Sequence, residues 1–370
     1  MSGIHHFVPV LHRGDAVGRH TLRLREATRA RGFRSDIFVD TVDDDTADET
    51  VAVLSYPEVA QPGDVVVYQF ATASAMAPWL AGRSETLVVN YHNVTPPELM
   101  APWDNHLALG QLRAQGDLRL LAPRTTLAVA DSAYNEAHLA ASSFATTAVV
   151  SPSAALDADA TDGDAAPTAG AGPGQPAAGA ADGGARWLAV GRVSPNKGLE
   201  STVAALAVAR AHSDPGATLH VIGKPATDSY VAALHRYVAE LGLAGAVRFA
   251  GHASDATVAS AYAAADVLVV TSEHEGFCVP VVEAMAAGVP VVAFDQGALP
   301  EVLGGAGALV PDKDPYALAA SISALLADAP RRAAMVEAGR RRLAELDLAA
   351  AADRFVSLLV PLAGRGAAPS

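Results

Sequence analysis

The sequence predicts an α/β protein with two doubly wound parallel sheets, one in each half of the chain. Short apolar segments alternate with helical or polar segments, which is typical of parallel sheets covered by helices on both faces. This alternation stops at residues 157–185 and then resumes. The chain has 370 residues, more than one hydrophobic core usually spans, so two domains of about 150 residues each are expected.

The predicted strands form two series. The first is expected at residues 4–10, 35–40, 64–70, 86–91 and 126–130, and the second at residues 187–191, 218–222, 246–250, 266–271, 289–294 and 307–310. Residues 157–185 contain no Leu, Ile, Val or aromatic residue, so they cannot bury enough apolar surface to order and are predicted to be a flexible linker. The two domains are therefore expected at residues 1–156 and 186–348.

Composition limits the classes of function. Hydrophobic residues make up 51% of the chain but aromatic residues only 5%, so cores built from Ala, Val and Leu are expected. The formal net charge of -14 argues against nucleic acid as a partner, because phosphate-backbone binding needs clustered positive charge over a large face.

The compartment is predicted from the cysteine content and the N-terminus. Cys278 is the only cysteine, which excludes an internal disulfide and suits a reducing cytoplasm. Without evidence for a base partner, it is predicted to be a small buried residue rather than a catalytic thiol. The apolar stretch at the N-terminus is too short for a signal peptide, and no segment approaches 18 apolar residues. A cytoplasmic protein is expected, either soluble or peripheral to the inner membrane face.

Glu275 and Glu283 lie where the predicted strand at 266–271 gives way to a helix, and such junctions bind ligands in doubly wound sheets. Pro280 suits the first turn of that helix and Gly288 the position just past its end, so it is predicted to be about two turns long. Carboxylates beside a donor-rich loop favour a polyhydroxylated ligand such as a sugar nucleotide. The alternative is that one glutamate is a solvated loop residue and the other a surface helix charge.

Arg192 and Lys197 mark a second junction between a strand and a helix. The strand ends at Gly191, a Ser-Pro turn follows, and Gly198 opens a long helical pattern. Arg binds phosphate oxygens through a planar fork and Lys as a point charge, beside a helix N-terminus that itself favours anions. A diphosphate would fit this site. The alternative is that both cations are simply solvated.

These segments together resemble the retaining glycosyltransferases of family four, which have the GT-B fold of two Rossmann-like domains facing a cleft. The resemblance rests on a G-R…K-G turn at 191–198, an E-G-F-x-x-P-x-x-E segment at 275–283 and a G-x-P-V-V-A strand at 288–293. It extends through VIGKP (221–225), VRFAGHAS (247–254) and GALPEVLGGAGALV (297–310), and so covers nearly the whole C-terminal half.

The resemblance implies specific roles. Arg192 and Lys197 would hold the donor diphosphate, Glu283 the ribose hydroxyls, and Glu275 the transferred sugar. The remaining residues of the implied donor site are Gly276, Phe277, Cys278, Val279, Gly223 and His252. The implied reaction is hexosyl transfer, with retention of configuration, from a nucleotide-diphosphate sugar to a hydroxyl acceptor. A UDP-sugar is favoured over a GDP-sugar by family breadth alone.

No metal or other cofactor is expected. Three Asp-x-Asp sequences resemble the metal site of another glycosyltransferase fold, at 157–159, 162–164 and 312–314, but the first two lie in the predicted linker and the third in a loop after a strand. Arg192 and Lys197 already supply the charge that Mg²⁺ would bring. Activity is therefore expected to survive chelation.

The N-terminal half supplies the candidates for the acceptor side. The resemblance places Gly14, Asp15 and Ala16 in a loop facing donor and acceptor, although most relatives have a Gly-Gly pair at Asp15-Ala16, which favours an acceptor contact for Asp15. His92 matches the family's interdomain histidine, with Asn93 beside it, and is expected to orient a sugar hydroxyl or carry a proton. A structural histidine bonded to its own turn is the alternative.

Two further segments have predicted roles. Ser132 is expected to cap a helix, and residues 349–370 resemble the terminal helix and tail that return to the first domain in this family. Arg19, Arg23, Arg25, Arg29, Arg31 and Arg34 form a local positive segment. It is either a solvated helix face or a surface for a phosphorylated acceptor or an anionic membrane.

Two other functions fit the same residues. A sugar-nucleotide epimerase of similar build would need no acceptor and no E-G-F-x-x-P-x-x-E segment. A catalytically silent sugar-nucleotide-binding protein would be expected to have lost one of the four charged residues, but Arg192, Lys197, Glu275 and Glu283 are all present.

Overall fold

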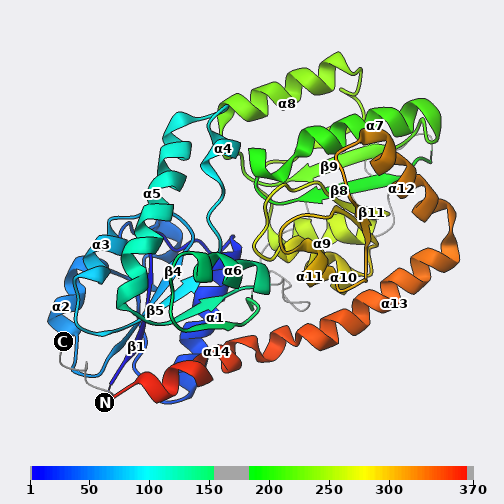
Figure 1. Cartoon of the computed structure of the whole chain (residues 1–370). Coiled ribbons are helices and arrows are strands. Elements are labelled where there is room, and N and C mark those ends of the chain that lie inside the picture. The colour runs from blue at the N-terminus through cyan, green and yellow to red at the C-terminus, as the bar shows by residue number, and fades with distance from the viewer. Residues whose placement is uncertain (1, 154–182, 365–370) are drawn as a thin grey trace. The chain divides into compact units, whose positions relative to one another are not determined.

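The computed structural model describes residues 2–153 and 183–364 and divides into two compact units. Unit 1 comprises Met1–Ala101, Asn105–Ala154 and Leu346–Ser370, and unit 2 comprises Pro102–Asp104 and Ala155–Glu345. Each unit contains one sheet in which all the strands are parallel (Figure 1). The 157–185 segment lies outside the described residues except for 183–185, where the Ala185 N–H donates to Asp214 Oδ2 (2.8 Å).

The sheet of unit 1 has seven strands in the order β3-β2-β1-β4-β5-β6-β7. They are β1 (Ile4–Val8), β2 (Ile37–Val39), β3 (Thr50–Ala52), β4 (Val65–Phe70), β5 (Thr86–Tyr91), β6 (Thr125–Ala130) and β7 (Thr147–Val149). The five predicted strands are confirmed. The outermost strands β3 and β7 were missed because each is only three residues long, begins with Thr and contains no fully buried residue, so neither carries a buried apolar run.

The helices of unit 1 lie between and after its strands in the chain. They are α1 (Ala16–Ala30), α2 (Tyr56–Val59), α3 (Met76–Ala81), α4 (Pro97–Met100), α5 (Asn105–Leu121), α6 (Ala133–Ala141) and α14 (Ala351–Leu359). Ser132 caps α6 as predicted, because its hydroxyl accepts from the Asn135 N–H (3.1 Å).

The last helix completes the core of unit 1 although it lies more than 300 residues from the first strand. In Figure 1, α14 (red) lies against α1 (blue). Phe355 and Leu359 are fully buried with Ile4 and Leu24 in one apolar cluster. Unit 1 therefore needs the end of the described chain to close its core.

The sheet of unit 2 has six strands in the order β10-β9-β8-β11-β12-β13. They are β8 (Arg186–Val190), β9 (Thr218–Ile222), β10 (Val247–Phe249), β11 (Val267–Val270), β12 (Val291–Phe294) and β13 (Ala308–Val310), so all six predicted strands are confirmed. Between and after them lie α7 (Leu199–His212), α8 (Asp228–Glu240), α9 (Asp255–Ala264), α10 (Val279–Ala287), α11 (Leu299–Leu303), α12 (Pro315–Ala327) and α13 (Ala329–Leu346). Its core is built mainly of Val, Leu and Ala, as the composition predicts.

The strand order places a possible site in each unit. In unit 2 the chain order reverses beside β8, whose neighbours are β9 and β11, and in unit 1 it reverses beside β1. The loops on the two sides of such a switch point leave in opposite directions and open a crevice at the carboxyl ends of the strands. No helix in the described part of the chain is both long and apolar enough to cross a membrane.

We predict that Phe355→Ala destabilises unit 1 by about 3–5 kcal/mol, because it removes a fully buried ring and leaves a cavity between α14, α1 and the sheet. Urea unfolding followed by circular dichroism measures the change. The matched control is Val360→Ala, one turn away and 36% exposed, which should leave the transition nearly unchanged. Equal effects of the two variants would contradict the assigned packing of α14.

Candidate functional site

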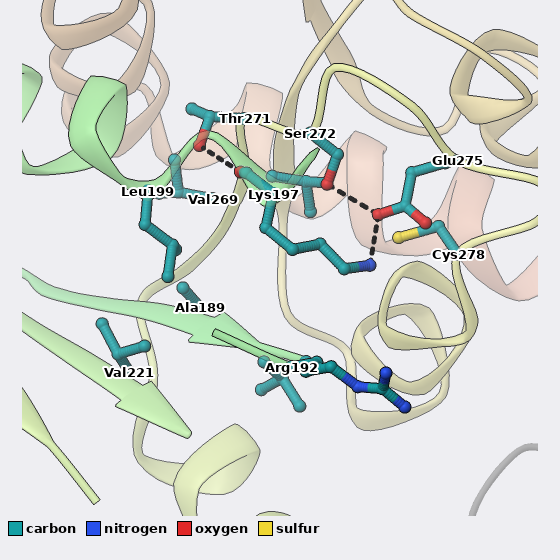
Figure 2. A pocket seen from close by; sticks show the side chains of 13 residues that line it. Ala189, Arg192, Lys197, Leu199, Val221, Val269, Thr271, Ser272, Glu275 and Cys278 are labelled. Carbon is teal, nitrogen blue, oxygen red and sulfur yellow. Dashed lines mark hydrogen bonds and ion pairs between the residues drawn. The ribbon is translucent and has the colours of Figure 1, made fainter. Parts of the chain in front are cut away.

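A pocket of about 330 Å³, open solvent included, lies at the switch point of unit 2. Figure 2 shows the side chains that line it, which come from the ends of β8, β9 and β11 and from the loops that follow β8 and β11. The lining residues are Ala189, Val190, Gly191, Arg192, Lys197, Leu199, Val221, Val269, Val270, Thr271, Ser272, Glu275 and Cys278. The floor is apolar and the charged groups stand at the loops, so a polar ligand would meet its partners there.

The loop after β8 is shaped by glycines. Gly191 ends the strand with φ 131°, a 3-10 turn covers Pro195–Lys197, and Gly198 has φ 58°. A Cβ on Gly198 would lie 2.4 Å from the Thr271 carbonyl oxygen, so any side chain there would separate α7 from the end of β11. The glycine of the K-G pair is therefore required because the backbone at Gly198 lies in close contact with the backbone at Thr271.

Hydrogen bonds join this loop to the loop after β11. The Thr271 hydroxyl donates to the Gly198 carbonyl (2.9 Å), and the Glu273 N–H donates to the Asn196 carbonyl (2.8 Å). These bonds hold Lys197 and Glu275, which are 78 residues apart, on rigid neighbouring loops. Sequence reasoning missed Thr271 and Ser272, although their position directly after a buried strand was a usable signal.

Lys197 and Glu275 form a partly buried ion pair with Nζ to Oε1 at 2.5 Å, and the Ser272 hydroxyl donates to the same carboxylate oxygen (2.6 Å). Figure 2 shows the ammonium pointing toward the carboxylate. Burial lowers the pKa of Lys197, but the Glu275 carboxylate more than compensates, so the net pKa is raised and the side chain stays cationic.

Arg192 differs from Lys197 in being exposed and unpaired. Within residues 2–153 and 183–364 its guanidinium forms no salt bridge or hydrogen bond, and Figure 2 draws no interaction to it. The three charges of the pocket, Arg192, Lys197 and Glu275, sum to +1. An anion entering the pocket would therefore meet one free guanidinium and one ammonium already shared with a carboxylate.

Helix α10 begins and ends as the sequence predicts. It has nine residues, Pro280 lies in its first turn, and Gly288 follows it with φ 71°. Cys278 precedes it with φ 75°, a strained conformation for a residue with a side chain. Burial, and then the nearby Glu275 carboxylate, raise the pKa of the Cys278 thiol, which therefore remains protonated and is not a catalytic thiolate, as predicted. Gly276, Phe277 and Val279 are also buried in this segment.

Glu275 and Glu283 are each only 7% exposed, so the reading of both as surface charges is wrong. Glu283 accepts a hydrogen bond from Tyr262 Oη (2.9 Å) and is not among the residues that line the pocket. The two glutamates therefore have different surroundings: Glu275 is paired with a cation inside the pocket, and Glu283 with a phenol on α9.

Two more glycines fix the rim of the pocket. A Cβ on Gly223, after β9, would lie 1.8 Å from the Gly191 carbonyl oxygen, and one on Gly297, after β12, would lie 2.7 Å from the Glu275 carbonyl oxygen. Gly297 is a third residue of this site that sequence reasoning missed, and the Ala298 N–H donates to that Glu275 carbonyl (3.0 Å). His252, in contrast, is exposed.

In unit 1 the predicted acceptor loop is a helix cap. Asp15 Oδ1 accepts from the Gly18 N–H at 2.6 Å and starts α1, so this oxygen has a structural partner. A Cβ on Gly18 would lie 1.8 Å from the His12 carbonyl oxygen, so Gly18, which sequence reasoning missed, is where this loop requires glycine. Gly14 is exposed and Ala16 half-buried.

His92 is buried and both of its ring nitrogens have protein partners. Nδ1 lies 2.9 Å from Asp131 Oδ2 and Nε2 lies 2.8 Å from Gln69 Oε1. The side chain is 4% exposed, and neither partner belongs to its own turn, so the alternative of a histidine bonded to its own turn is wrong. Asn93 has φ 81°, and its side-chain oxygen accepts from the Val94 N–H (2.8 Å).

The Arg-rich segment consists largely of paired charges. Arg25 binds Glu49, Arg29 lies 3.4 Å from Asp36, Arg31 3.4 Å from Asp353, and Arg34 3.2 Å from Asp64. Arg23 donates to the Ser153 carbonyl (2.6 Å). The segment is thus much less positive than its sequence suggests.

Of the three Asp-x-Asp sequences considered above, only 312–314 lies in the described part of the chain, and it is part of a helix cap. Asp314 accepts from the Tyr316 N–H (3.0 Å) at the start of α12, and Asp312 accepts from the Asp314 N–H (3.2 Å). The sequences at 157–159 and 162–164 lie outside the described residues.

Comparisons with known proteins point to one family. A family model described as glycosyl transferases group 1 matches residues 176–342. MMP alpha-(1->4)-mannosyltransferase of Mycolicibacterium hassiacum is 42% identical over 115 residues, 30% of this chain and 28% of the relative. D-inositol 3-phosphate glycosyltransferase of Corynebacterium diphtheriae is 35% identical over 174 residues, 46% of this chain and 40% of the relative. The matches thus span less than half the length of these curated relatives.

Solved structures match over nearly the whole chain. Sucrose-phosphate synthase from Thermosynechococcus elongatus has a TM-score of 0.74 at 21% identity, covering 98% of this chain and 99% of its own. HepE of Anabaena, solved in complex with UDP-glucose, has a TM-score of 0.71 at 20% identity, covering 96% of this chain and 99% of its own. At such identities the likeness shows the fold alone. The chain therefore has the GT-B fold, and its residues 176–342 match the glycosyl transferases group 1 family.

Proposed function

We propose that this protein is a retaining glycosyltransferase that moves a hexose from a nucleotide-diphosphate sugar to a hydroxyl acceptor without a metal ion. One observation carries the proposal: the pocket at the switch point of unit 2 presents the unpaired Arg192 beside the partly buried Lys197–Glu275 pair. Cations close to a helix N-terminus suit a diphosphate, and a carboxylate suits sugar hydroxyls.

The charges assign a role to each group. Arg192 would bind the diphosphate directly, since its guanidinium has no other partner in the described chain. Lys197 would share its ammonium between the phosphate and Glu275. Glu275 and the amides of Gly276 and Phe277 would face the sugar, and Glu283 the ribose. These roles follow the family resemblance, and the position of Glu275 in the lining of the pocket supports its role.

In the reaction, the bond between the anomeric carbon and the diphosphate oxygen breaks through an oxocarbenium-like state. The acceptor oxygen bonds to the same face of the anomeric carbon, and its proton passes to the departing diphosphate. The protein's part is to stabilise the negative charge that develops on that diphosphate, with Arg192 and Lys197 already in place.

The donor base and the acceptor are proposed from the relatives. A UDP-sugar is favoured because HepE was solved with UDP-glucose, and a GDP-sugar is the second choice. D-inositol 3-phosphate glycosyltransferase and phosphatidyl-myo-inositol mannosyltransferase carry inositol in their names, so inositol-type acceptors come first in a screen.

We predict that one nucleotide among UDP, GDP, ADP and dTDP, or its sugar derivative, selectively raises the unfolding midpoint, both without added metal and in excess EDTA. Saturation at 100 times the dissociation constant adds about 2.7 kcal/mol of stability, which a thermal-shift assay detects easily. No shift with any nucleotide would contradict the donor site. A shift that EDTA abolishes and Mg²⁺ or Mn²⁺ restores would contradict metal independence.

Turnover separates the transferase from the alternatives. We predict that Arg192→Ala and Lys197→Ala each lower kcat/KM by about 10²–10³-fold, or about 3–4 kcal/mol, because each removes a charge that stabilises the departing diphosphate. Arg341→Ala, on the exposed surface of α13, is the control and should be unaffected. Near-normal turnover in Lys197→Ala would refute the assignment. Donor turnover that needs no acceptor and yields an isomerised sugar nucleotide would favour the epimerase, and no turnover the silent binder.

We predict that vesicles containing anionic lipid do not carry the protein upward in a flotation assay at physiological salt. Arg23, Arg25, Arg29, Arg31 and Arg34 are engaged with acidic or carbonyl partners, so little charge is left for the membrane. Flotation that increases with the fraction of anionic lipid would show instead that this segment binds membranes.

A further inference from the structure

A line of buried polar side chains crosses unit 1 from Ser153, where the first described segment ends, to Asp131, after β6. Its members are Ser153, His20, Asn90, Gln69, His92 and Asp131, and His6 branches from Gln69. The side chains of His92 and Asp131 are 4% and 7% exposed and the other members at most 3%, so no water shell sets the direction of their hydrogen bonds. The chemistry of the groups sets it instead.

The donor-to-acceptor direction of the hydrogen bonds along this line is fixed at Ser153. Its backbone N–H donates to His20 Nδ1 (3.1 Å), and a backbone N–H can only donate. Burial, followed by the neighbouring His92, holds the pKa of His20 well below its ordinary value, so the ring is neutral. A neutral imidazole has one acceptor and one N–H. Because Nδ1 accepts, the hydrogen of His20 must be on Nε2.

Asn90 accepts the hydrogen bond that His20 Nε2 donates. Its amide contacts His20 Nε2 at 3.0 Å and the Gln69 amide at 2.9 Å. The two ends of an amide have nearly the same shape, and the hydrogen-bond network decides which is the oxygen. With the amide nitrogen facing Nε2, both nitrogens of His20 would be acceptors, and the ring would have to be an imidazolate. The Asn90 oxygen therefore faces His20.

The orientation of the Asn90 amide determines that of the Gln69 amide in turn. An Asn90 oxygen needs a donor from Gln69, so the Gln69 NH₂ group faces Asn90 and also His92 Nε2, 2.8 Å away. The Gln69 oxygen then faces His6 Nδ1 (3.3 Å), which can donate because burial and the adjacent His5 lower the pKa of His6 to about 3 and leave it neutral. In this arrangement the oxygen and nitrogen of each amide exchange places, so Gln69 presents its nitrogen and not Oε1 to His92 Nε2.

We call the chain of hydrogen bonds from Ser153 through His20, Asn90 and Gln69 to His92 the relay. We propose that this relay holds His92 in one neutral tautomer, with its hydrogen on Nδ1, donated to Asp131, and its Nε2 accepting from Gln69. Ser153, His20, Asn90, Gln69 and Asp131 are then positioning residues for His92. In this state His92 has no free ring nitrogen to remove a proton from an acceptor. That leaves deprotonation to the departing diphosphate, and only this consequence rests on the proposed function.

The test is a spectrum of the full chain labelled with ¹⁵N at histidine and recorded by long-range ¹H–¹⁵N NMR at neutral pH. The His92 signals are assigned by their loss in His92→Gln. The expected pattern is a protonated Nδ1 and an unprotonated Nε2 for His92, and the reverse for His20. A hydrogen on His92 Nε2, alone or together with one on Nδ1, would overturn the proposal.

Two isosteric variants test the direction of the relay. Asn90→Asp and Gln69→Glu each exchange a fully buried amide for a carboxylate of the same shape. A carboxylate at position 90 still accepts from both His20 and Gln69, so the His92 pattern should not change. A carboxylate at position 69 cannot donate, so His92 Nε2 should gain a hydrogen. The same His92 pattern in both variants would refute the relay.

The unmodified protein already decides the tautomer, so the proposal stays testable if a buried carboxylate prevents either variant from folding. Circular dichroism monitors folding in each case. Absence of transferase activity with the predicted His92 pattern would count against the proposed function and leave the relay intact. Full activity with a hydrogen on His92 Nε2 would refute the relay and leave the proposed function intact.

Discussion

The ion pair between Lys197 and Glu275 is the interaction on which the site of unit 2 depends. A buried charge without a partner costs several kcal/mol, so each of the two keeps the other in the pocket. The pair holds together the loops that leave the central strands β8 and β11, and it leaves Arg192 as the unpaired positive charge of the pocket. A ligand with both phosphate and hydroxyl groups matches this distribution of charge.

The pair can form because the backbones around it approach closely. Gly198 lies against the Thr271 carbonyl, Gly223 against the Gly191 carbonyl, and Gly297 against the Glu275 carbonyl. Each contact is too short for a Cβ, and each joins two loops at the carboxyl ends of neighbouring strands. The site is thus built from rigid backbone contacts, and the side chains of Lys197 and Glu275 are held by loops with little freedom to move.

Unit 1 stabilises the buried polar side chains of the relay by hydrogen bonds among neutral groups, not by an ion pair. Its sheet carries His6, Gln69 and Asn90 inward at full burial, where an unsatisfied polar group would be costly. A connected network lowers that cost, and the direction of its hydrogen bonds starts from one backbone N–H at Ser153. The two units therefore differ in the interactions at their strand ends: unit 2 has an ion pair, and unit 1 has a neutral hydrogen-bonded relay.

The sequence alone determined the two parallel sheets, the strands of unit 2, the caps of α6 and α10, and the cations and carboxylates of the pocket. These features depend on local periodicity or on single residues such as Pro280, Gly288 and Ser132, so a linear pattern contains them. The short strands β3 and β7 have no such pattern, because pairing at the outer edges of a sheet requires no apolar run.

Only the tertiary structure decided which charges are paired. Arg192 and Lys197 look alike in the sequence, yet one is exposed and the other lies 2.5 Å from a carboxylate 78 residues away. Six arginines in one segment look like a basic surface, yet their partners come from as far as Asp353. Electrostatic energy depends on distance in space and on burial, and neither follows from spacing along the chain.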